Sequence, residues 1–431
     1  MFRKWNRFWK VAGMLGLLLF STPLGGQTLQ VPARSQALSL TIPVPENQVL
    51  EKGAKYALRS ESSPDLMVPL HWIPSRNADG TLRESQGKFT AVIPPEKTSE
   101  DWRFFQLEKF SAPPPSSQAS FSWREEGETT LVAEDGQGKI LAYHYRPISR
   151  KEIADFRNTR ACYIHPLWGL QGEVLTDDFP PDHYHHHGIF WAWMHVERDG
   201  KDHDLWMSKD IFQQFEQFLH RQSDSALVLG VENSWQKEGE SIMTERVWIQ
   251  SYPVGDGGRC LDLDLYWIPT TKAITLRGAE GKSYGGLTVR FAIPPKKGRP
   301  QITTSEGISQ EDLPVCPLKW VDVCGNFAQS ENGIAPENAT EMAPPSGAAI
   351  FIPTDHPGDP QKGWPPTWLT RFYGMMAVGW PGVEGKTFAP GEVIHLRYRV
   401  WIHDGNISWE RLNQRYEDYL ATEKVSWIRE P

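Results

Sequence analysis

Residues 261–267 read LDLDLYW, and this stretch decides the fold class. Successive side chains of a β-strand point to opposite faces. Leu261, Leu263 and Leu265 therefore share one face, while Asp262 and Asp264 share the other. Strict alternation of this kind is typical of an antiparallel strand with one face in the core and one polar face.

The same alternation recurs along the chain. Residues 395–401 read HLRYRVW and place His395, Arg397 and Arg399 opposite an apolar face. Similar short runs stand between turn-forming Gly, Pro, Asn and Asp residues, as in LVAEDGQGKILAYHY, ALVLGVENSW, TERVWIQSY and LTVRFAI. We therefore expect an all-β protein built around a large antiparallel β-sandwich.

Helical patterns are scarce. Residues 407–423, ISWERLNQRYEDYLATE, carry apolar residues at helical spacing and offer Ser408 as an N-cap, so the sequence predicts a C-terminal helix here. Residues 209–221, KDIFQQFEQFLHR, fit a helix or a strand equally well.

The first 26 residues have the layout of a secretory signal peptide. Arg3, Lys4, Arg7 and Lys10 precede an apolar run over residues 11–20, and small and turn-forming residues follow. An uncleaved membrane anchor is the alternative, but about ten apolar residues fall short of the roughly 20 that span a bilayer. We expect cleavage near Gly26 and a periplasmic or secreted protein.

The remaining chain divides into two parts in our interpretation. A smaller N-terminal β segment covers residues 27–147, and the sandwich domain with the C-terminal helix covers residues 148–431. No repeat with a period of 20 to 50 residues indicates a propeller or solenoid.

Charge and composition narrow the partners. The chain has 45 basic and 53 acidic residues, a formal charge of -8 and no basic run beyond its first ten residues, which argues against nucleic-acid binding. We expect no membrane span in the mature protein. Of the four cysteines, Cys316 and Cys324 are the best candidates for a disulfide, with buried free thiols as the alternative.

The segment that attracts functional interest is residues 179–193, FPPDHYHHHGIFWAW. If it is extended, His183, His185 and His187 share one face and His186 the other. A pair of histidines two apart on a strand can hold a transition metal, but the glutamate that a cupin-like site would supply nearby is missing. Buried hydrogen-bonded histidines and acid/base or substrate-binding histidines are the alternatives.

Other polar residues stand in apolar surroundings. Glu245, Arg290, Arg371 and Tyr373 are each more typical of an ordinary strand position, but together they could meet the histidines if the loops converge. Many of the 19 tryptophans lie in polar contexts such as PLWGL, FWAWMH, DLWMS and GWPPTW. Their rings can stack on sugars, although core packing is the usual role of tryptophan.

Several motifs resemble, in order, those of the exported bacterial family known as "methane oxygenase PmoA". They are CYIHPLWGLQGEVLTDDFPPDHYHHHGIFWAW, GKSYGGLTVRF, KWVDVCGNF, TDHPGDP and PPTWLTRFYG, over roughly residues 148–404. The family's motif positions fall on Asp182, His183, His185, His186, Gly188, Asp355, His356, Arg371 and Tyr373. His187 departs from the pattern, because the family often has arginine there.

The resemblance implies a β-supersandwich similar to galactose mutarotase and a sugar ligand. It does not imply methane oxidation, since a particulate methane monooxygenase subunit is an integral membrane protein. We therefore expect an enzyme that acts on a carbohydrate by acid/base chemistry, in hydrolysis, elimination or epimerisation. His183, His185, His186 and Glu245 are the predicted catalytic residues. Asp182, Arg290, Asp355, His356, Arg371 and Tyr373 are the predicted substrate-binding residues.

Two other functions remain open from the sequence. One is a mononuclear metal enzyme with His183, His185 and Asp355 or His356 as ligands, although we predict no cofactor. The other is a non-catalytic glycan-binding protein whose tryptophans contact the ligand and whose histidines are structural.

Overall fold

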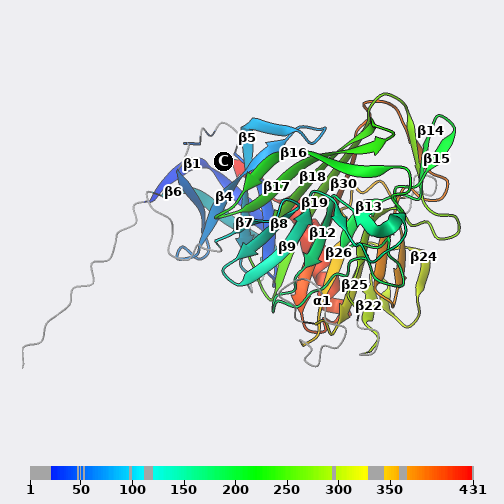
Figure 1. The fold of residues 1–431 in the computed structure, drawn as a ribbon. Coiled ribbons are helices and arrows are strands. Elements are labelled where there is room, and N and C mark those ends of the chain that lie inside the picture. Colours follow the sequence, from blue (N-terminus) through cyan, green and yellow to red (C-terminus); the bar gives the residue numbers. More distant parts are fainter. Residues whose placement is uncertain are drawn as a thin grey trace, which may run out of the picture.

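The computed structural model describes residues 21–45, 48, 50–51, 54–96, 100–110, 120–293, 298–328, 344–358 and 366–429. The expected signal peptide lies mostly outside these residues, since strand β1 begins at Ser21. The described chain is dominated by antiparallel sheets, and within it the single α-helix lies near the C-terminus (Figure 1).

The N-terminal sheet runs in the order β2 (Leu38–Pro43), β5 (Leu82–Ile93), β4 (Met67–Arg76), β3 (Lys55–Ser60), β6 (Trp102–Phe110), β1 (Ser21–Pro32) and β31 (Ser426–Arg429). The sheet that we call the β13 sheet runs β24 (Leu313–Pro317), β27 (Thr367–Arg371), β28 (Met375–Gly379), β21 (Gly286–Arg290), β13 (Ile189–Ala192), β12 (Tyr163–Leu167), β9 (Gly138–His144), β8 (Thr130–Asp135) and β7 (Ser122–Glu126). The β19 sheet runs β16 (Phe212–Gln222), β17 (Leu227–Lys237), β18 (Glu240–Ser251), β19 (Gly258–Pro269), β30 (Ile394–Asp404), β26 (Ser346–Phe351), β25 (Trp320–Gly325), β22 (Gln301–Thr304) and β23 (Gly307–Ser309).

Smaller elements complete the fold. They are the four-stranded sheet β15 (Lys201–His203), β14 (His195–Arg198), β20 (Ile274–Arg277) and β29 (Lys386–Phe388), the pair β10 (Ile148–Ser149) and β11 (Thr159–Arg160), the short helices η1 (Phe156–Asn158) and η2 (Thr422–Lys424), and helix α1 (Trp409–Ala421). The segment that fits a helix or a strand equally well is strand β16.

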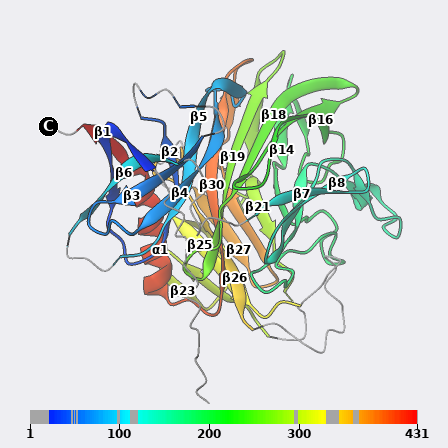
Figure 2. The same ribbon diagram turned by 90° about the vertical axis from the view of Figure 1, so that its left-hand side faces the viewer.

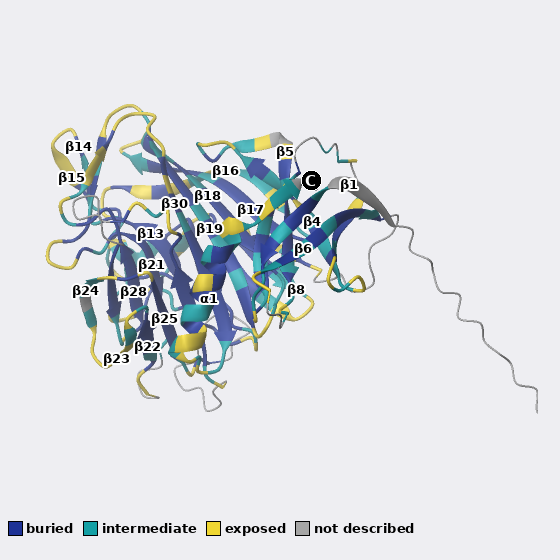
Figure 3. Cartoon of the chain, turned by 180° about the vertical axis from the view of Figure 1, so that it is seen from behind, coloured by how far each residue is buried: buried dark blue, intermediate teal, exposed yellow. Residues whose placement is uncertain are grey.

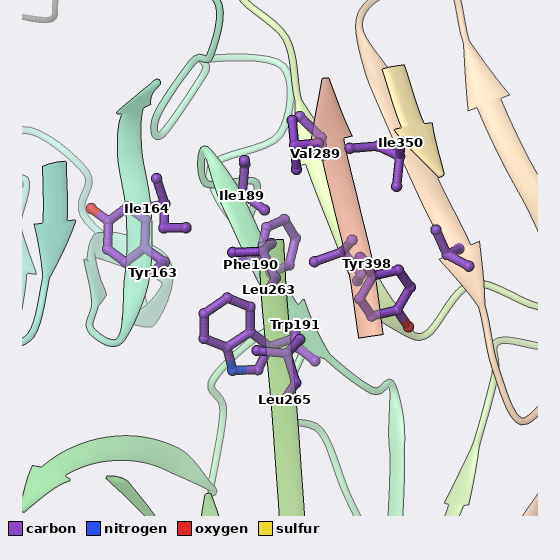
Figure 4. Close-up of a cluster of buried hydrophobic side chains, with 14 of the residues drawn as sticks. Tyr163, Ile164, Ile189, Phe190, Trp191, Leu263, Leu265, Val289, Ile350 and Tyr398 are labelled. Carbon is purple, nitrogen blue, oxygen red and sulfur yellow. The ribbon is translucent and has the colours of Figure 1, made fainter. Parts of the chain in front are cut away.

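The β13 and β19 sheets face each other across one hydrophobic core, which makes the large sandwich. Ile164, Ile189 and Val289 from the β13 sheet pack with Leu263 and its neighbours from the β19 sheet (Figure 4). Viewed from behind, the sandwich strands are mostly buried, whereas much of the exposed surface lies in loops and on β15 (Figure 3). The expected all-β sandwich is confirmed.

The alternation in LDLDLYW is confirmed by burial. Leu261, Leu263 and Leu265 lie in the sandwich core, whereas Asp262 and Asp264 project from the outer face of β19. Asp264 accepts a hydrogen bond from Arg76 of β4 at 2.8 Å. The polar face of β19 is therefore where the N-terminal sheet packs onto the sandwich.

The sheets divide near residue 121 and not at the expected boundary of residue 147. Strands β7, β8 and β9 pair within the β13 sheet, although they fall inside the expected N-terminal segment. Strand β31, close to the C-terminus, pairs with β1 and joins the N-terminal sheet. The chain thus leaves the N-terminal sheet after β6 and returns to it at the end.

Helix α1 forms where the sequence predicts it, and Ser408 caps it by accepting a hydrogen bond from the Arg411 amide at 3.3 Å. Its apolar side packs on Phe351 and Trp401 from the outer face of the β19 sheet. Figure 2 shows α1 beside β25 and β26, next to the N-terminal strands. No helix in the described ranges is long and apolar enough to cross a membrane.

The expected disulfide between Cys316 and Cys324 is absent, and all four cysteines are free thiols. Cys316 lies on β24, which pairs with β27, whereas the Cys324 sulfur on β25 lies 3.2 Å from the Asn406 side-chain oxygen. The two cysteines are close in sequence but belong to different sheets, so the alternative of free thiols holds.

Candidate functional site

The histidine segment turns twice instead of extending. The His183 amide donates to the Pro180 carbonyl at 2.9 Å, and the His186 amide donates to the His183 carbonyl at 2.9 Å. Pro181 occupies the second position of the first turn, where its fixed φ is favoured. The predicted split of the histidines into two strand faces was therefore wrong.

The two turns gather three of the four imidazoles. The rings of His183 and His186 stack with centroids 4.6 Å apart, and His185 meets His186 edge-on, also at 4.6 Å. Tyr373, from the turn between β27 and β28, stacks on His183 at 5.0 Å. The histidine segment and the turn that carries Tyr373 are nearly 190 residues apart in sequence, yet they meet in one aromatic cluster, as expected if the loops converge.

An ion pair stands beside this cluster. Arg290, at the end of β21, donates through Nη2 to both carboxylate oxygens of Asp182, at 2.9 and 3.0 Å. One of these oxygens also lies 2.9 Å from His183 Nδ1. The Arg290 guanidinium carbon lies 4.8 Å from the centre of the Tyr373 ring. Asp182, His183, His185, His186, Arg290 and Tyr373 form what we call the histidine site.

The histidine site has an exposed rim and a buried base. The side chains of Asp182 and His183 are 45% and 35% exposed, whereas His186 and Arg290 are almost fully buried. Five buried nitrogen atoms of the site have no hydrogen-bond partner among the described residues: Nδ1 of His183, Nδ1 of His185, Nδ1 of His186, and Nε and Nη1 of Arg290. His183 Nδ1 is the one that lies close to an acceptor, since the Asp182 carboxylate is 2.9 Å away, but outside hydrogen-bond geometry. Buried polar groups are normally paired, so this concentration of unpaired nitrogens indicates a place where a ligand or water binds.

Burial sets the protonation of these groups. It lowers the pKa of His185 to about 4 and holds the pKa of His186 well below its usual value, with neighbouring histidines adding to both effects. Burial alone would raise the pKa of Asp182, but contacts with His183 and Arg290 outweigh it and keep that pKa low. At neutral pH the imidazoles of His185 and His186 are therefore neutral, and they lie beside the Asp182 carboxylate and the Arg290 guanidinium.

His187 is structural. Its Nδ1 lies 2.8 Å from the Asp178 carboxylate, which also accepts a hydrogen bond from the Tyr163 hydroxyl at 2.9 Å. All three side chains lie away from solvent, and burial lowers the pKa of His187 strongly. His187 thus anchors the turn to β12, consistent with its place outside the predicted site.

Glu245 does not meet the histidines. Its carboxylate is fully buried between the sheets and accepts hydrogen bonds from Asn233, Trp235 and Trp267, each at 2.9 Å, and from Gln213. Every neighbour is a core side chain of the β19 sheet. The expected partnership between Glu245 and the histidines is not found, because Glu245 points into the core.

Three other predicted site residues are also bound elsewhere. Asp355 accepts from Arg397 at 2.6 Å, and His356 Nε2 lies 3.4 Å from the Tyr398 hydroxyl. Arg371 donates to the Leu313 carbonyl at 2.7 Å, which ties β27 to β24. None of the three contacts the imidazoles in the described part of the chain, so the structure places them outside the histidine site.

The tryptophans of these contexts that the structure describes are core residues, and Trp364 lies outside the described residues. Trp168, Trp191, Trp193, Trp206 and Trp368 are all buried, and Trp72 of the N-terminal sheet is the exposed tryptophan among the described residues. The polar residues next to these tryptophans in the sequence lie on turns beside the strands, so the sequence makes the buried rings look exposed. Trp206 contributes to the site indirectly, since its ring packs against His186 at 6.1 Å.

The described residues do not bring together the side chains that a metal centre needs. No group of three or more His, Cys, Asp or Glu side chains there could hold a metal ion. The rings of His183 and His186 stack face to face, and His185 meets His186 edge-on.

Asp177 lies near the histidine site but was not among the residues predicted from the sequence. Burial raises the pKa of this carboxyl group to about 6, against the opposing effect of Arg290. Its backbone carbonyl accepts from the Gly188 amide and its amide donates to the Arg290 carbonyl, both at 2.8 Å. The available signal was the pair Asp177 and Asp178 directly before the Phe-Pro-Pro turn.

Buried histidines predict a fall in stability towards acid pH. Burial lowers the pKa of His71, His144, His165 and His185 to about 4. The unfolded chain therefore binds more protons than the folded chain between about pH 4 and pH 6.5, and stability present above that window is lost as the pH falls through it.

The measurement is a urea unfolding curve at each pH. Asp177 and Asp418, whose pKa values burial raises to about 6, act in the opposite direction, as do His195 and His403, whose pKa values nearby carboxylates raise. The buried histidines with lowered pKa values outnumber these groups, since His186, His187 and His356 belong with the four named above. We expect a lower urea midpoint at about pH 5 than at about pH 7. An equal or higher midpoint at the lower pH would contradict the prediction.

Comparison with known proteins places the chain in a family. No curated protein matches it. The sequence profile of a family of unknown function, DUF6807, matches residues 130–417, from β8 into α1. The match covers more than half of the chain and the whole histidine site. The chain therefore belongs to the family of unknown function DUF6807.

Proposed function

We propose that this protein is an exported enzyme that acts on a carbohydrate by acid/base chemistry at the histidine site. The observation that carries the proposal is the contact between Asp182 and His183 Nδ1 at 2.9 Å, on the exposed rim. A carboxylate at one imidazole nitrogen orients the ring and leaves the other nitrogen for proton transfer. His183 is the general base in this proposal, and Asp182 positions it.

Three further features support this function. His183 Nε2 makes no hydrogen bond within the described residues, so it is free to meet a substrate. His185 and His186 remain neutral at physiological pH, because burial lowers their pKa values. Tyr373, which is 38% exposed, offers a hydroxyl beside the same imidazoles.

The resemblance to the "methane oxygenase PmoA" proteins and to galactose-mutarotase supersandwiches belongs to this proposal as well. The family shown by the comparison carries no activity in its name. What the resemblance contributes is the expectation of a sugar ligand and of export, and the experiment below tests the sugar ligand.

The test is glycan screening followed by substitution of His183. On a glycan that the protein converts, we expect His183→Ala to lower kcat/KM by about 100-fold or more, the usual contribution of a general base. The matched control is His220→Ala, since His220 lies on β16 and its side chain contacts Gln222 and the ring of Trp248, away from the histidine site. Equal activity of the His183 variant and the wild type would overturn the proposal.

Chelation and binding separate the two rival functions. Activity that survives prolonged chelator treatment is expected here, because proton transfer by His183 needs no metal. Loss of activity on chelation and its return with one metal would favour the metal enzyme. Calorimetric binding of an oligosaccharide that stays unaltered would favour a glycan-binding protein.

A further inference from the structure

The buried guanidinium of Arg290 has more hydrogen-bond donors than the protein uses. Its side chain is 6% exposed, and Asp182 engages Nη2 alone. Nε and Nη1 have no partner within the described chain. A buried charged group with unpaired N–H bonds is costly, so a ligand that supplies acceptors there would bind favourably.

The contacts among the described residues of the site do not include the paired carboxyl groups of an ordinary glycoside hydrolase, and the nearby Asp177 carboxyl group accepts from the Asp178 amide at 2.8 Å. Such enzymes place two carboxyl groups on opposite sides of the scissile bond. Here Asp182 is the carboxylate that contacts the imidazoles, and it is engaged by Arg290 and His183. Glu245 lies in the core and cannot serve as the second.

We propose, resting on the proposed carbohydrate function, that the substrate is a uronic acid whose carboxylate binds Arg290 and that the reaction is β-elimination. Arginine is the side chain best suited to a carboxylate, through charge-assisted hydrogen bonds. Pairing a uronate carboxylate with a guanidinium acidifies the neighbouring C–H bond, because the charge that develops on the carboxylate is stabilised.

The residues at the rim can then complete the reaction. His183 Nε2 takes the proton from the carbon that bears the carboxylate, and the C–H electron pair forms a double bond to the next ring carbon. The C–O bond on that carbon breaks, and its electron pair leaves with the glycosidic oxygen. Tyr373 donates its hydroxyl proton to that oxygen and regains one from solvent, as His183 returns its proton to solvent.

Tyr373 fits the role of proton donor and of a movable cover. Burial raises its pKa, although Arg290 opposes the effect, so the hydroxyl is protonated at neutral pH. Its ring lies over Arg290 and His183, and its hydroxyl makes no hydrogen bond in the described part of the chain. Stacking of this kind is weak, so the ring can slide aside to admit a carboxylate.

The test compares uronate oligosaccharides with the same oligosaccharides after reduction of their carboxyl groups. Galacturonate, glucuronate, mannuronate and guluronate oligomers are incubated with the full mature protein in heavy-oxygen water. We expect conversion of a uronate oligomer to a product with ultraviolet absorbance from the new double bond, without heavy oxygen, and no conversion of its reduced counterpart.

Two variants link the reaction to the residues. Tyr373→Phe removes only the hydroxyl and is expected to lower kcat by about 100-fold with KM nearly unchanged. Arg290→Gln is expected to lower kcat/KM for the uronate by about 100-fold. Arg124→Lys, on the exposed strand β7, is the control and should change neither value.

The outcomes separate this inference from the proposed function. Conversion of the reduced oligomers, or heavy oxygen in the product, would overturn the uronate elimination while leaving acid/base action on a carbohydrate intact. Failure to convert any uronate oligomer would also overturn it. Full activity of His183→Ala would remove the proposed function and this inference together.

Discussion

Replacing Glu245 with alanine is expected to lower the free energy of unfolding by about 3 to 5 kcal/mol, the usual effect of removing one partner from a buried charged network. The carboxylate of Glu245 is fully buried in β18. Its removal leaves the hydrogen-bond donors around it without an acceptor in a region that water does not reach.

The size of the effect follows from the neighbours. Gln213 of β16, Asn233 and Trp235 of β17, and Trp267 of β19 all donate to Glu245. A buried donor without a partner costs about 1 to 3 kcal/mol, and four side chains lose theirs together. Relaxation of the core recovers part of that cost, which keeps the expected total near 3 to 5 kcal/mol.

The measurement is urea unfolding of Glu245→Ala beside wild type. Glu128→Ala is the control, because Glu128 lies exposed in the turn between β7 and β8 and should change stability by no more than about 0.5 kcal/mol. Unchanged stability of the Glu245 variant, combined with loss of turnover, would contradict the structural role and return Glu245 to the list of catalytic residues.

The fold could be predicted from the sequence because one physical rule governs most of it. A strand with one face in the core and one face outside must alternate apolar and polar residues, and residues 261–265 do so without a break. The opposing polar face could not be interpreted in the same way. Asp264 and Arg397 look solvated in sequence, yet they lie where the N-terminal sheet and the loop after β26 cover the sandwich.

The histidine site was predicted in part. The sequence marked Arg290 and Tyr373 as polar residues in apolar surroundings that could meet the histidines if the loops converged, and in the structure they lie beside His183 and His186. The geometry within the segment was wrong because Pro181 starts a turn, and a turn replaces the period of two. The sequence carries no signal for which ring nitrogens remain unpaired.

The residues that lie far from the histidines in sequence were the least predictable members of the candidate site. Glu245 was matched to the histidines by its residue type and His356 by its residue type and the family resemblance, but a carboxylate or imidazole can be satisfied by any hydrogen-bond partner that the fold brings near. The fold offers Glu245 the tryptophans of β17 and β19, and it offers His356 the hydroxyl of Tyr398. The order of the strands in the sheet decides which donor lies near a given side chain, and the residues of a single segment do not predict that order.

Replacing Gly188 with alanine is expected to destabilise the protein by about 3 kcal/mol and to abolish ligand binding at the histidine site. A methyl group at Gly188 would lie 1.9 Å from the Ile164 carbonyl oxygen and 2.7 Å from His165 Cβ. Both neighbours belong to β12, which pairs with β13 directly after Gly188. Neither atom is the end of a flexible side chain, so one strand must move.

Gly188 cannot move away on its own, because its backbone is held on both sides. Its amide donates to the Asp177 carbonyl and its carbonyl accepts from the Arg290 amide, each at 2.8 Å. A shift of Gly188 therefore displaces Arg290 together with the turns that carry the imidazoles. Loss of stability and loss of function are expected to occur together in this variant for one steric reason.

The control is Gly136→Ala, at a turn where an added methyl group meets no atom within 4 Å. That variant should match wild type in the urea midpoint to within about 0.5 kcal/mol and in ligand binding. If Gly188→Ala were as stable as Gly136→Ala, strands β12 and β13 would have to separate freely at this point. The rigid placement of Arg290 beside the histidines, on which both proposals for the site depend, would then be wrong.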